Sequence, residues 1–407
     1  MNETFSRYQR FVVALLAFLQ FTVVLDFMIL SPLGALLIEK LNVTPAQFGR
    51  VVSAYAFSAG VSGLLAAGFA DRFDRRKLLL FFYVGFVFGT LLCGVATSYE
   101  FLLGARIVTG IFGGVIGSIS FAIVADLFPL SMRGRVMGLV QSSFAASQIL
   151  GIPIGLFLAT HLGWHAPFLM IVGVSVLAGI AIVLWLRPIT GHLSTGAAKR
   201  NPIEHLVRTA TRPRYFAGFS ATVLLATGGF MLMPFGSTFL VQNLGIALEK
   251  LPMVYVITGA AAMVTGPLMG RVSDSFGKYR TFLLGTILTS IMVVWYTGLS
   301  SASLGFIIVL NVLLFAGISA RMVSSFALTS ALPDLPDRGA YMSISSSLQQ
   351  LAGGLASFSA GLIVHQATPA SPLEGYPTLG WVVVLAMLVT LGLMFNVHRL
   401  VKRTATA

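Results

Sequence analysis

The chain has 407 residues, of which 57% are hydrophobic and only 10% are charged, and its formal net charge is +13. A soluble chain would carry about 25% charged residues, so this composition excludes an ordinary soluble protein and indicates membrane-embedded helices. The basic residues are scattered over short connections between apolar segments and form no basic domain, which argues against a nucleic-acid partner. The single cysteine, Cys93, excludes a disulfide framework and a thiolate metal site.

Twelve apolar segments follow one another along the chain. Each is long enough to cross the roughly 30 Å of bilayer hydrocarbon as a helix. The predicted spans cover residues 11–38, 46–70, 78–98, 101–126, 135–160, 166–186, 214–242, 252–272, 280–300, 303–330, 339–365 and 378–399. We therefore predict an all-α membrane protein with twelve transmembrane helices.

The distribution of lysine and arginine predicts how the chain is oriented. If both termini are cytoplasmic, 21 of the 26 basic residues lie on the cytoplasmic side and three lie outside. Cytoplasmic loops of membrane proteins carry an excess of Lys and Arg. The sequence therefore predicts a multi-pass protein with both termini in the cytoplasm.

A dense charged loop between the second and third spans recurs in the second half of the chain. The loop at 67–77 reads AGFADRFDRRK, and GRVSDSFGKYR at 270–280 repeats its pattern 203 residues later. A hydrophilic stretch with several Pro, Gly, Ser and Thr residues lies between the sixth and seventh spans. We predict two pseudo-symmetric six-helix bundles, at 1–186 and 214–407, joined by a cytoplasmic linker at 187–213.

The charged loop resembles the signature G-x-x-x-D-x-x-G-[RK]-[RK] of the major facilitator superfamily of transporters. The matching residues are Asp71, Arg75 and Arg76 in the first copy and Gly270, Asp274, Gly277 and Lys278 in the second. Two glycines of the signature are replaced in the first copy, by Ala67 and Asp74. Because aspartate tolerates the left-handed backbone conformation, we expect Asp74 to preserve the turn.

Within that superfamily the chain is similar to the twelve-helix drug:proton antiporter branch, including its sugar, nucleoside and arabinose efflux relatives. The residues that carry this similarity are Asp26, Pro32, Gly49, Tyr55, Arg106, Gly110, Gly151, Pro153, Gly155, Gly163, Trp164 and Phe168. The run from Gly151 to Gly155 resembles the antiporter motif of span five in a loosened form, because Ile152 separates Gly151 from Pro153. His165 stands where the family usually has arginine.

Three charged residues lie more than four residues from either end of a predicted span: Asp26, Arg106 and Arg321. A charge at mid-bilayer costs at least about 2.5–3.5 kcal/mol, so each needs a partner, a cavity or a role. Asp26 either couples transport to protons or contacts substrate, or it is a structural residue paired permanently with an arginine. The resemblance implies that Arg106 influences proton handling near Asp26. Arg321 either binds an anionic group or extends to the cytoplasmic surface; its aligned residue in the first half is Ile116, and Asn311 aligns with Arg106.

Two further groups of residues are functional candidates. The resemblance implies a cytoplasmic gate with the charged members Asp71, Arg75, Arg76, Asp126, Asp274 and Lys278. In this gate Asp126 is positioned to pair with Arg75; the alternative is a solvated loop with a weak surface salt bridge. The polar residues expected either to line a substrate cavity or to join helices are Tyr55, Gln141, Asn311, Arg321 and Gln349.

The sequence contains no phosphate-binding glycine loop, metal-ligand cluster or nucleophile elbow, so we expect neither an enzyme nor a cofactor. We predict a secondary active transporter that exports a small organic or amphipathic molecule against protons by alternating access. The alternatives are an uncoupled facilitator or importer on the same fold, or a transport-dead membrane receptor. The expected partners are a small-molecule substrate, protons and the lipid bilayer. We expect a monomer in the cytoplasmic, or inner, membrane of a bacterium.

Overall fold

Long helices run through both halves of the chain in the computed structural model, which describes residues 5–194, 202–334 and 337–405. Within these ranges, the side chains that are not described are those of Ala67, Gly68, Asp71, Leu130, Ser131, His192, Ser194, Pro202, Ile203, Thr404 and Ala405. Outside the helices, the described residues include one isolated antiparallel bridge, between His365 and Glu374. The all-helical class predicted from the sequence is confirmed.

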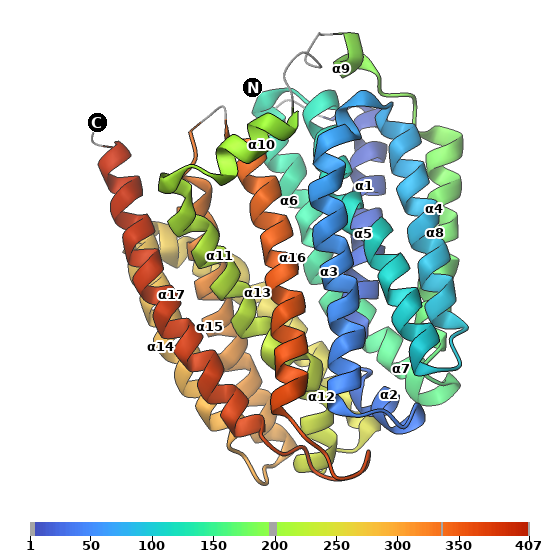
Figure 1. Ribbon diagram of the computed structural model, residues 1–407, viewed down its shortest axis with the longest axis vertical. Coiled ribbons are helices and arrows are strands. Elements are labelled where there is room, and N and C mark those ends of the chain that lie inside the picture. Colours follow the sequence, from blue (N-terminus) through green and yellow to red (C-terminus); the bar gives the residue numbers. More distant parts are fainter. Residues whose placement is uncertain (1–4, 195–201, 335–336, 406–407) are drawn as a thin grey trace. The chain divides into compact units, whose positions relative to one another are not determined.

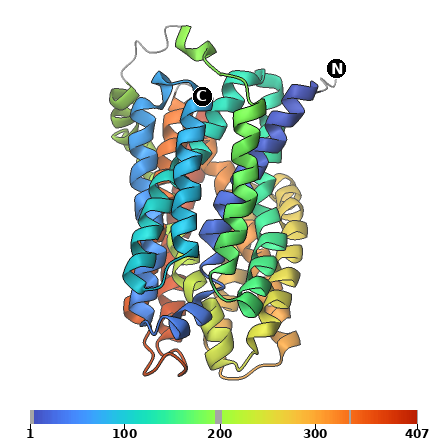
Figure 2. The ribbon, with the colours of Figure 1, turned by 90° about the vertical axis from the view of Figure 1, so that its right-hand side faces the viewer.

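The first of two compact units, unit 1, comprises Met1–Leu30 and Ala54–His205. Its helices, labelled in Figure 1, are α1 (Arg7–Ile29), most of α3 (Pro45–Phe69), α4 (Arg75–Gly94), α5 (Tyr99–Leu127), α6 (Leu130–Ala146), α7 (Ile152–Leu162), α8 (Ala166–Trp185) and α9 (Gly191–Ser194). Helix α4 packs along α5 and α8, and α1 packs along α6 and α8. Figure 2 gives a second view of these helices, with α1 in dark blue beside the green α8.

Unit 2 comprises Ser31–Ser53 and Leu206–Ala407. Its helices are α2 (Gly34–Lys40), the start of α3, most of α10 (Pro202–Ala210), α11 (Pro213–Leu232), α12 (Gly236–Thr238), α13 (Leu251–Phe276), α14 (Lys278–Thr297), α15 (Leu304–Ser330), α16 (Arg338–Ile363) and α17 (Tyr376–Ala405). Ser31–Ser53 joins this unit through contacts such as the hydrogen bond that Ser237 Oγ donates to the Ser31 carbonyl, at 2.9 Å. The division at 1–186, 187–213 and 214–407 stays a prediction.

Eleven helices of the described chain are long and apolar enough to cross a membrane. The remaining predicted span, at 339–365, corresponds to α16, a helix of 26 residues. This helix is not among the eleven; its sequence is rich in Gly, Ser and Gln. The single span predicted at 11–38 is wrong in its second half: α1 ends at Ile29, and α2 begins only after the segment that contains Pro32.

Glycines allow the helices of unit 1 to approach closely. A Cβ on Gly110 of α5 would lie 2.5 Å from the carbonyl oxygen of Tyr55 on α3, and one on Gly89 of α4 would lie 2.7 Å from the backbone nitrogen of Thr109. Small residues at such positions let helix backbones pack against each other inside a membrane. These contacts fix α5 against both neighbouring helices, α3 and α4.

Candidate functional site

A buried ion pair joins α1 and α5 in the interior of unit 1. Arg106 Nη1 lies 2.7 Å from Asp26 Oδ2, and both side chains are at most 1% exposed. The same Nη1 donates a second, longer hydrogen bond of 3.3 Å to the backbone carbonyl of Asp26. The sequence predicted both residues as candidates but left open whether they touch; the structure brings them together across 80 positions of the chain.

Two further side chains complete the surroundings of this pair. Thr90 of α4 donates a hydrogen bond of 3.1 Å to Asp26 Oδ1, so both carboxylate oxygens have a partner. The guanidinium carbon of Arg106 lies 4.5 Å from the centre of the Tyr55 ring, which is 1% exposed. This distance places the cation over the aromatic face, where attraction to the ring supports it. Arg106 Nε is buried and has no hydrogen-bond partner among the described residues.

The sequence around each residue explains how the pair forms. Gly110 lies one helical turn after Arg106, and its contact with the backbone of Tyr55 holds this part of α5 directly against α3. Thr90 was missed by the sequence analysis. Its signal was a hydroxyl side chain inside an apolar span, one residue after Gly89, where α4 touches α5.

The antiporter-like motif of span five packs against the same part of α1. A Cβ on Gly151 would lie 2.6 Å from Leu25 Cδ1, and one on Gly155 would lie 2.7 Å from Ile29 Cδ1. Gly151 ends a π-helical turn, Ser147–Gly151, that immediately precedes α7. Pro153 has no N–H to continue the normal helical bonding, which accounts for wider turns at this point. The motif therefore supports α1 on both sides of Asp26.

The first copy of the charged loop is held together by an ion pair between α4 and α5. Arg75 Nε lies 3.1 Å from Asp126 Oδ2, with the side chains 6% and 21% exposed. Arg75 also donates a hydrogen bond of 3.0 Å to the Ala70 carbonyl. The predicted pairing of Arg75 with Asp126 is confirmed as a contact. Arg76 donates to the Val183 carbonyl at 2.5 Å, and the side chain of Asp71 lies outside the described residues.

The expectation for Asp74 is wrong. Its φ of −55° is not left-handed, and its side chain caps the start of α4 by accepting a hydrogen bond of 2.9 Å from the Arg76 backbone N–H. In the second copy Gly277 does adopt a positive φ, of 102°. Aspartate is a preferred N-cap residue, so the two copies start their helices by different means. Asp274 and Lys278 of the second copy are exposed and form no ion pair within 4.0 Å with any described residue.

The remaining cavity candidates are divided between the two units. Gln141 is exposed on α6, and Gln349 is half-buried on α16. Asn311 donates a hydrogen bond of 3.0 Å to the Ile307 carbonyl of its own helix. Arg321 is 4% exposed, and its Nε and Nη2 are buried without a hydrogen-bond partner among the described residues. Its guanidinium carbon lies 5.8 Å from the centre of the Phe282 ring.

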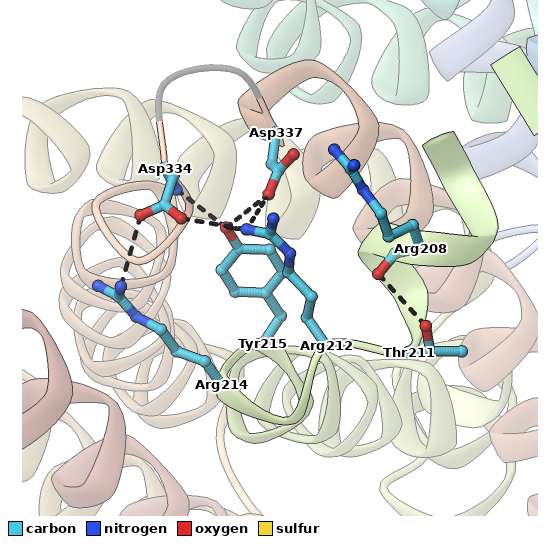
Figure 3. A network of polar contacts seen from close by, with 7 residues as sticks. All are labelled: Arg208, Thr211, Arg212, Arg214, Tyr215, Asp334 and Asp337. Carbon is cyan, nitrogen blue, oxygen red and sulfur yellow. Dashed lines mark hydrogen bonds and ion pairs between the residues drawn. The ribbon is translucent and has the colours of Figure 1, made fainter. Parts of the chain in front are cut away.

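A second polar network, shown in Figure 3, lies in unit 2 and was not anticipated from the sequence. Arg212 Nη1 lies 2.6 Å from Asp337 Oδ2 and 3.1 Å from Asp334 Oδ2. The hydroxyl of Tyr215 donates to Asp337 Oδ2 at 2.9 Å. Arg214 Nη1 adds a contact of 3.4 Å to Asp334. These contacts fasten the start of α11 to the connection between α15 and α16.

A bundle of membrane-length helices with a buried ion pair, and an internal repeat of the charged loop, define a polytopic membrane protein of transporter type. A family model described as Major Facilitator Superfamily matches residues 16–222 and 218–406. The chain belongs to the Major Facilitator Superfamily, as its sequence predicted. Its relatives are transporters and not enzymes.

Known proteins similar to this chain are also transporters. It is 25% identical to the uncharacterized MFS-type transporter YbcL of Bacillus subtilis (strain 168), covering 94% of this chain and 95% of that protein. It is 27% identical to YceJ, another uncharacterized MFS-type transporter of that organism, over 66% of this chain and 68% of the relative. A protein of Mannheimia succiniciproducens named "Probable sugar efflux transporter" is 24% identical over 63% of this chain and 61% of the relative.

Solved structures of transporters share the fold. A bacterial homolog of the human lysosomal transporter Spinster, in an inward-facing and occupied conformation, gives a TM-score of 0.80 at 16% identity and covers 97% of this chain and 98% of its own. The xylose transporter XylE from E. coli, in a partially occluded inward-open conformation, gives a TM-score of 0.73 at 15% identity. This match covers 95% of this chain and 98% of the XylE chain. The predicted two-bundle transporter fold is thereby confirmed.

Proposed function

We propose that this chain is a proton-coupled secondary transporter that exports a small organic or amphipathic molecule by alternating access. Asp26 carries the proton and Arg106 controls when the carboxylate is free to accept it. The observation that supports this proposal is the fully buried Asp26–Arg106 pair at 2.7 Å. A buried charge of this kind inside a membrane span marks a proton or substrate pathway by default.

The contacts of the pair suggest how coupling works. The contact with Nη1 of Arg106 favours the ionised form of Asp26, since both carboxylate oxygens accept hydrogen bonds. A substrate group or water that draws Arg106 away leaves Asp26 buried without a cation. An unpaired carboxylate in such surroundings binds a proton, because burial penalises the charged form. Restoring the pair expels the proton, to whichever side is then open.

The direction of transport is proposed from the name of a relative. A relative that matches 63% of this chain is named a probable sugar efflux transporter, which supports export. The antiporter-like motif supports antiport, because it packs Gly151 and Gly155 against α1, the helix that carries Asp26.

We place the chain in the cytoplasmic (inner) membrane with both termini inside, from the distribution of its basic residues.

The contact of Arg75 with Asp126 supports a cytoplasmic gate at the first charged loop. In this proposal the link between α4 and α5 holds when the cytoplasmic side is closed and loosens when that side opens. In the second copy the exposed Arg271, Lys278 and Arg280 outnumber the exposed Asp274, so this loop contributes basic charge at the surface.

The experiment that tests the function is substrate-driven proton movement in proteoliposomes, with a panel of dyes, sugars, nucleosides and amphipaths. We expect one class of compound to drive proton flux in the wild type and none in Asp26→Asn, while binding persists. Glu249→Gln, which neutralises an exposed carboxylate near the start of α13, is the matched control and should transport normally. Loss of flux in both variants would contradict a specific role for Asp26.

One observation favours a second candidate, the uncoupled facilitator. Asp26 has partners on both carboxylate oxygens, as a permanently paired structural aspartate would. In that case Asp26→Asn would continue to move substrate, without any proton signal in mutant or wild type.

A further inference from the structure

An open cavity of about 490 Å³ lies at one end of unit 1, where α1 begins and α8 ends. It is lined by Arg7, Tyr8, Phe11, Trp185 and Arg187. The membrane-spanning part of α1 starts at Arg7, and that of α8 stops at Trp185. The cavity is therefore at the level of the lipid headgroups, whichever side of the membrane it faces.

The side chains of this cavity are ordered by contacts with one another. The guanidinium carbon of Arg187 lies 4.9 Å from the centre of the Tyr8 ring. The backbone N–H of Arg187 donates a hydrogen bond of 3.0 Å to the Tyr8 hydroxyl. Phe11 meets Trp185 edge-on, with 6.3 Å between the ring centres. The ends of the two helices are thus joined around the opening, and the cavity is more than a gap between loose side chains.

The two arginines give the cavity a positive charge. Neither Arg7 nor Arg187 lies within 4.0 Å of a carboxylate oxygen among the described residues. Asp74, which lies close to this end of the chain's first unit, is engaged with the backbone N–H groups of Arg76 and Ile189. Two guanidinium groups with no carboxylate partner among the described residues suit a phosphate, which takes paired hydrogen bonds from arginine.

The surroundings indicate that the phosphate belongs to a lipid. Trp185 is 60% exposed, and tryptophan and tyrosine are enriched where a protein meets lipid headgroups. On the same helix Leu177 and Leu184 are 66% and 64% exposed, which offers apolar surface to acyl chains. Basic pockets between transmembrane helices bind anionic headgroups in this way.

We propose that Arg7 and Arg187 bind the headgroup phosphate of an anionic phospholipid, with Tyr8, Phe11 and Trp185 packed around its glycerol and upper acyl region. The lipid bridges the first turn of α1 and the last turn of α8. It thereby steadies the helix that carries Asp26, but the site does not depend on any role of Asp26 in transport.

The test is lipid binding to the purified full-length protein in detergent, measured by native mass spectrometry and by thermal stabilisation. The probes are phosphatidylglycerol, phosphatidylcholine and soluble glycerol 3-phosphate. We expect phosphatidylglycerol to bind and to raise the melting temperature more than phosphatidylcholine, and glycerol 3-phosphate to have little effect. In Arg7→Gln/Arg187→Gln the affinity for phosphatidylglycerol should fall about tenfold or more, as two charge-assisted contacts are lost.

The matched control is Arg271→Gln/Arg399→Gln, which removes two exposed arginines of unit 2 and the same net charge. This control should keep its affinity for phosphatidylglycerol. If both double variants lost the same affinity for phosphatidylglycerol, the attraction would be diffuse and the proposed site would be overturned. The proposal would also be overturned if glycerol 3-phosphate bound as well as phosphatidylglycerol, because the ligand would then be a soluble anion.

A second measurement does not depend on the folding of the double variant. In a Trp295→Phe/Trp381→Phe background, which removes the two other exposed tryptophans, phosphatidylglycerol with brominated acyl chains should quench the tryptophan fluorescence, and adding Trp185→Phe should remove most of that quenching. Unchanged quenching in Trp185→Phe would place the lipid elsewhere and overturn the proposal.

Discussion

The buried arginines of the two units differ in their partners. Arg106 of unit 1 is fully buried and pairs with Asp26 at 2.7 Å, whereas Arg321 of unit 2 is 4% exposed and two of its nitrogens have no hydrogen-bond partner among the described residues. The sequence alignment of the halves puts Asn311 opposite Arg106 and Ile116 opposite Arg321. For these buried arginines, therefore, the repeat preserves the course of the backbone and not the position of the charge.

The same difference appears in the charged loops. In the first copy Arg75 is bound to Asp126, while in the second Asp274 and Lys278 are exposed. A duplicated fold needs matching helix lengths and contacts, but a polar site needs to exist only once. Four substitutions test whether the ion pair of unit 1 is the specialised feature.

The largest effect is expected for Arg106→Met. It leaves Asp26 buried without its cation, and breaking one side of a buried ion pair costs about 3–5 kcal/mol of unfolding free energy. Denaturant or thermal unfolding in detergent measures the change. The double variant Asp26→Asn/Arg106→Gln removes both charges and should recover most of the loss. If Arg106→Met alone loses less than about 1 kcal/mol, the pair is not the stabilising contact that its geometry indicates.

The next effect is expected for Gly110→Ala. Its new Cβ would lie 2.5 Å from the Tyr55 carbonyl oxygen and 2.1 Å from Ser58 Oγ, so α3 and α5 must separate. Overpacking of this kind costs about 1–3 kcal/mol and would also move Arg106 away from Asp26. Gly104→Ala is the control on the same helix, because no atom lies within 4 Å of its added Cβ. Equal melting temperatures for the two variants would contradict the close approach.

A smaller effect distinguishes the two loops. Arg75→Gln removes charge-assisted contacts to Asp126 and Ala70, and should cost about 1.5–3 kcal/mol. Lys278→Gln, at an exposed position, should stay within about 0.5 kcal/mol of the wild type. Chemical denaturation of both variants gives the comparison. If Lys278→Gln lost more unfolding free energy than Arg75→Gln, the loop of unit 2 would be the one held by ionic contacts, contrary to the structure.

The smallest effect on stability is expected for Arg321→Met. Removing a buried cation that pairs with no carboxylate among the described residues relieves its desolvation, so the melting temperature should stay the same or rise. The measurement is thermal unfolding without ligand, beside Arg106→Met. A loss as large as that of Arg106→Met would mean that the two units do not differ in the way described.

Much of the fold was predictable from the sequence, since it depends on patterns that each segment carries by itself. Apolar length predicted the spans, and helices formed at all twelve places, with α1 shorter than expected because the chain breaks near Pro32. Asp74 was misjudged because one residue type serves both left-handed turns and helix N-caps, and only the neighbouring N–H groups of Arg76 and Ile189 decide between them.

The residues of the candidate site were predictable from the sequence, but the contacts between them were not. Asp26 and Arg106 stood out because a charge inside an apolar span is costly wherever it lies. By itself, then, the sequence determined the membrane class, the internal repeat, the superfamily and the charged candidates. Tertiary structure alone decided that Asp26 contacts both Arg106 and Thr90, while Arg321 lies beside the ring of Phe282. The reason is physical: hydropathy acts on each helix separately, whereas a partner depends on which faces meet where glycines let helix backbones touch.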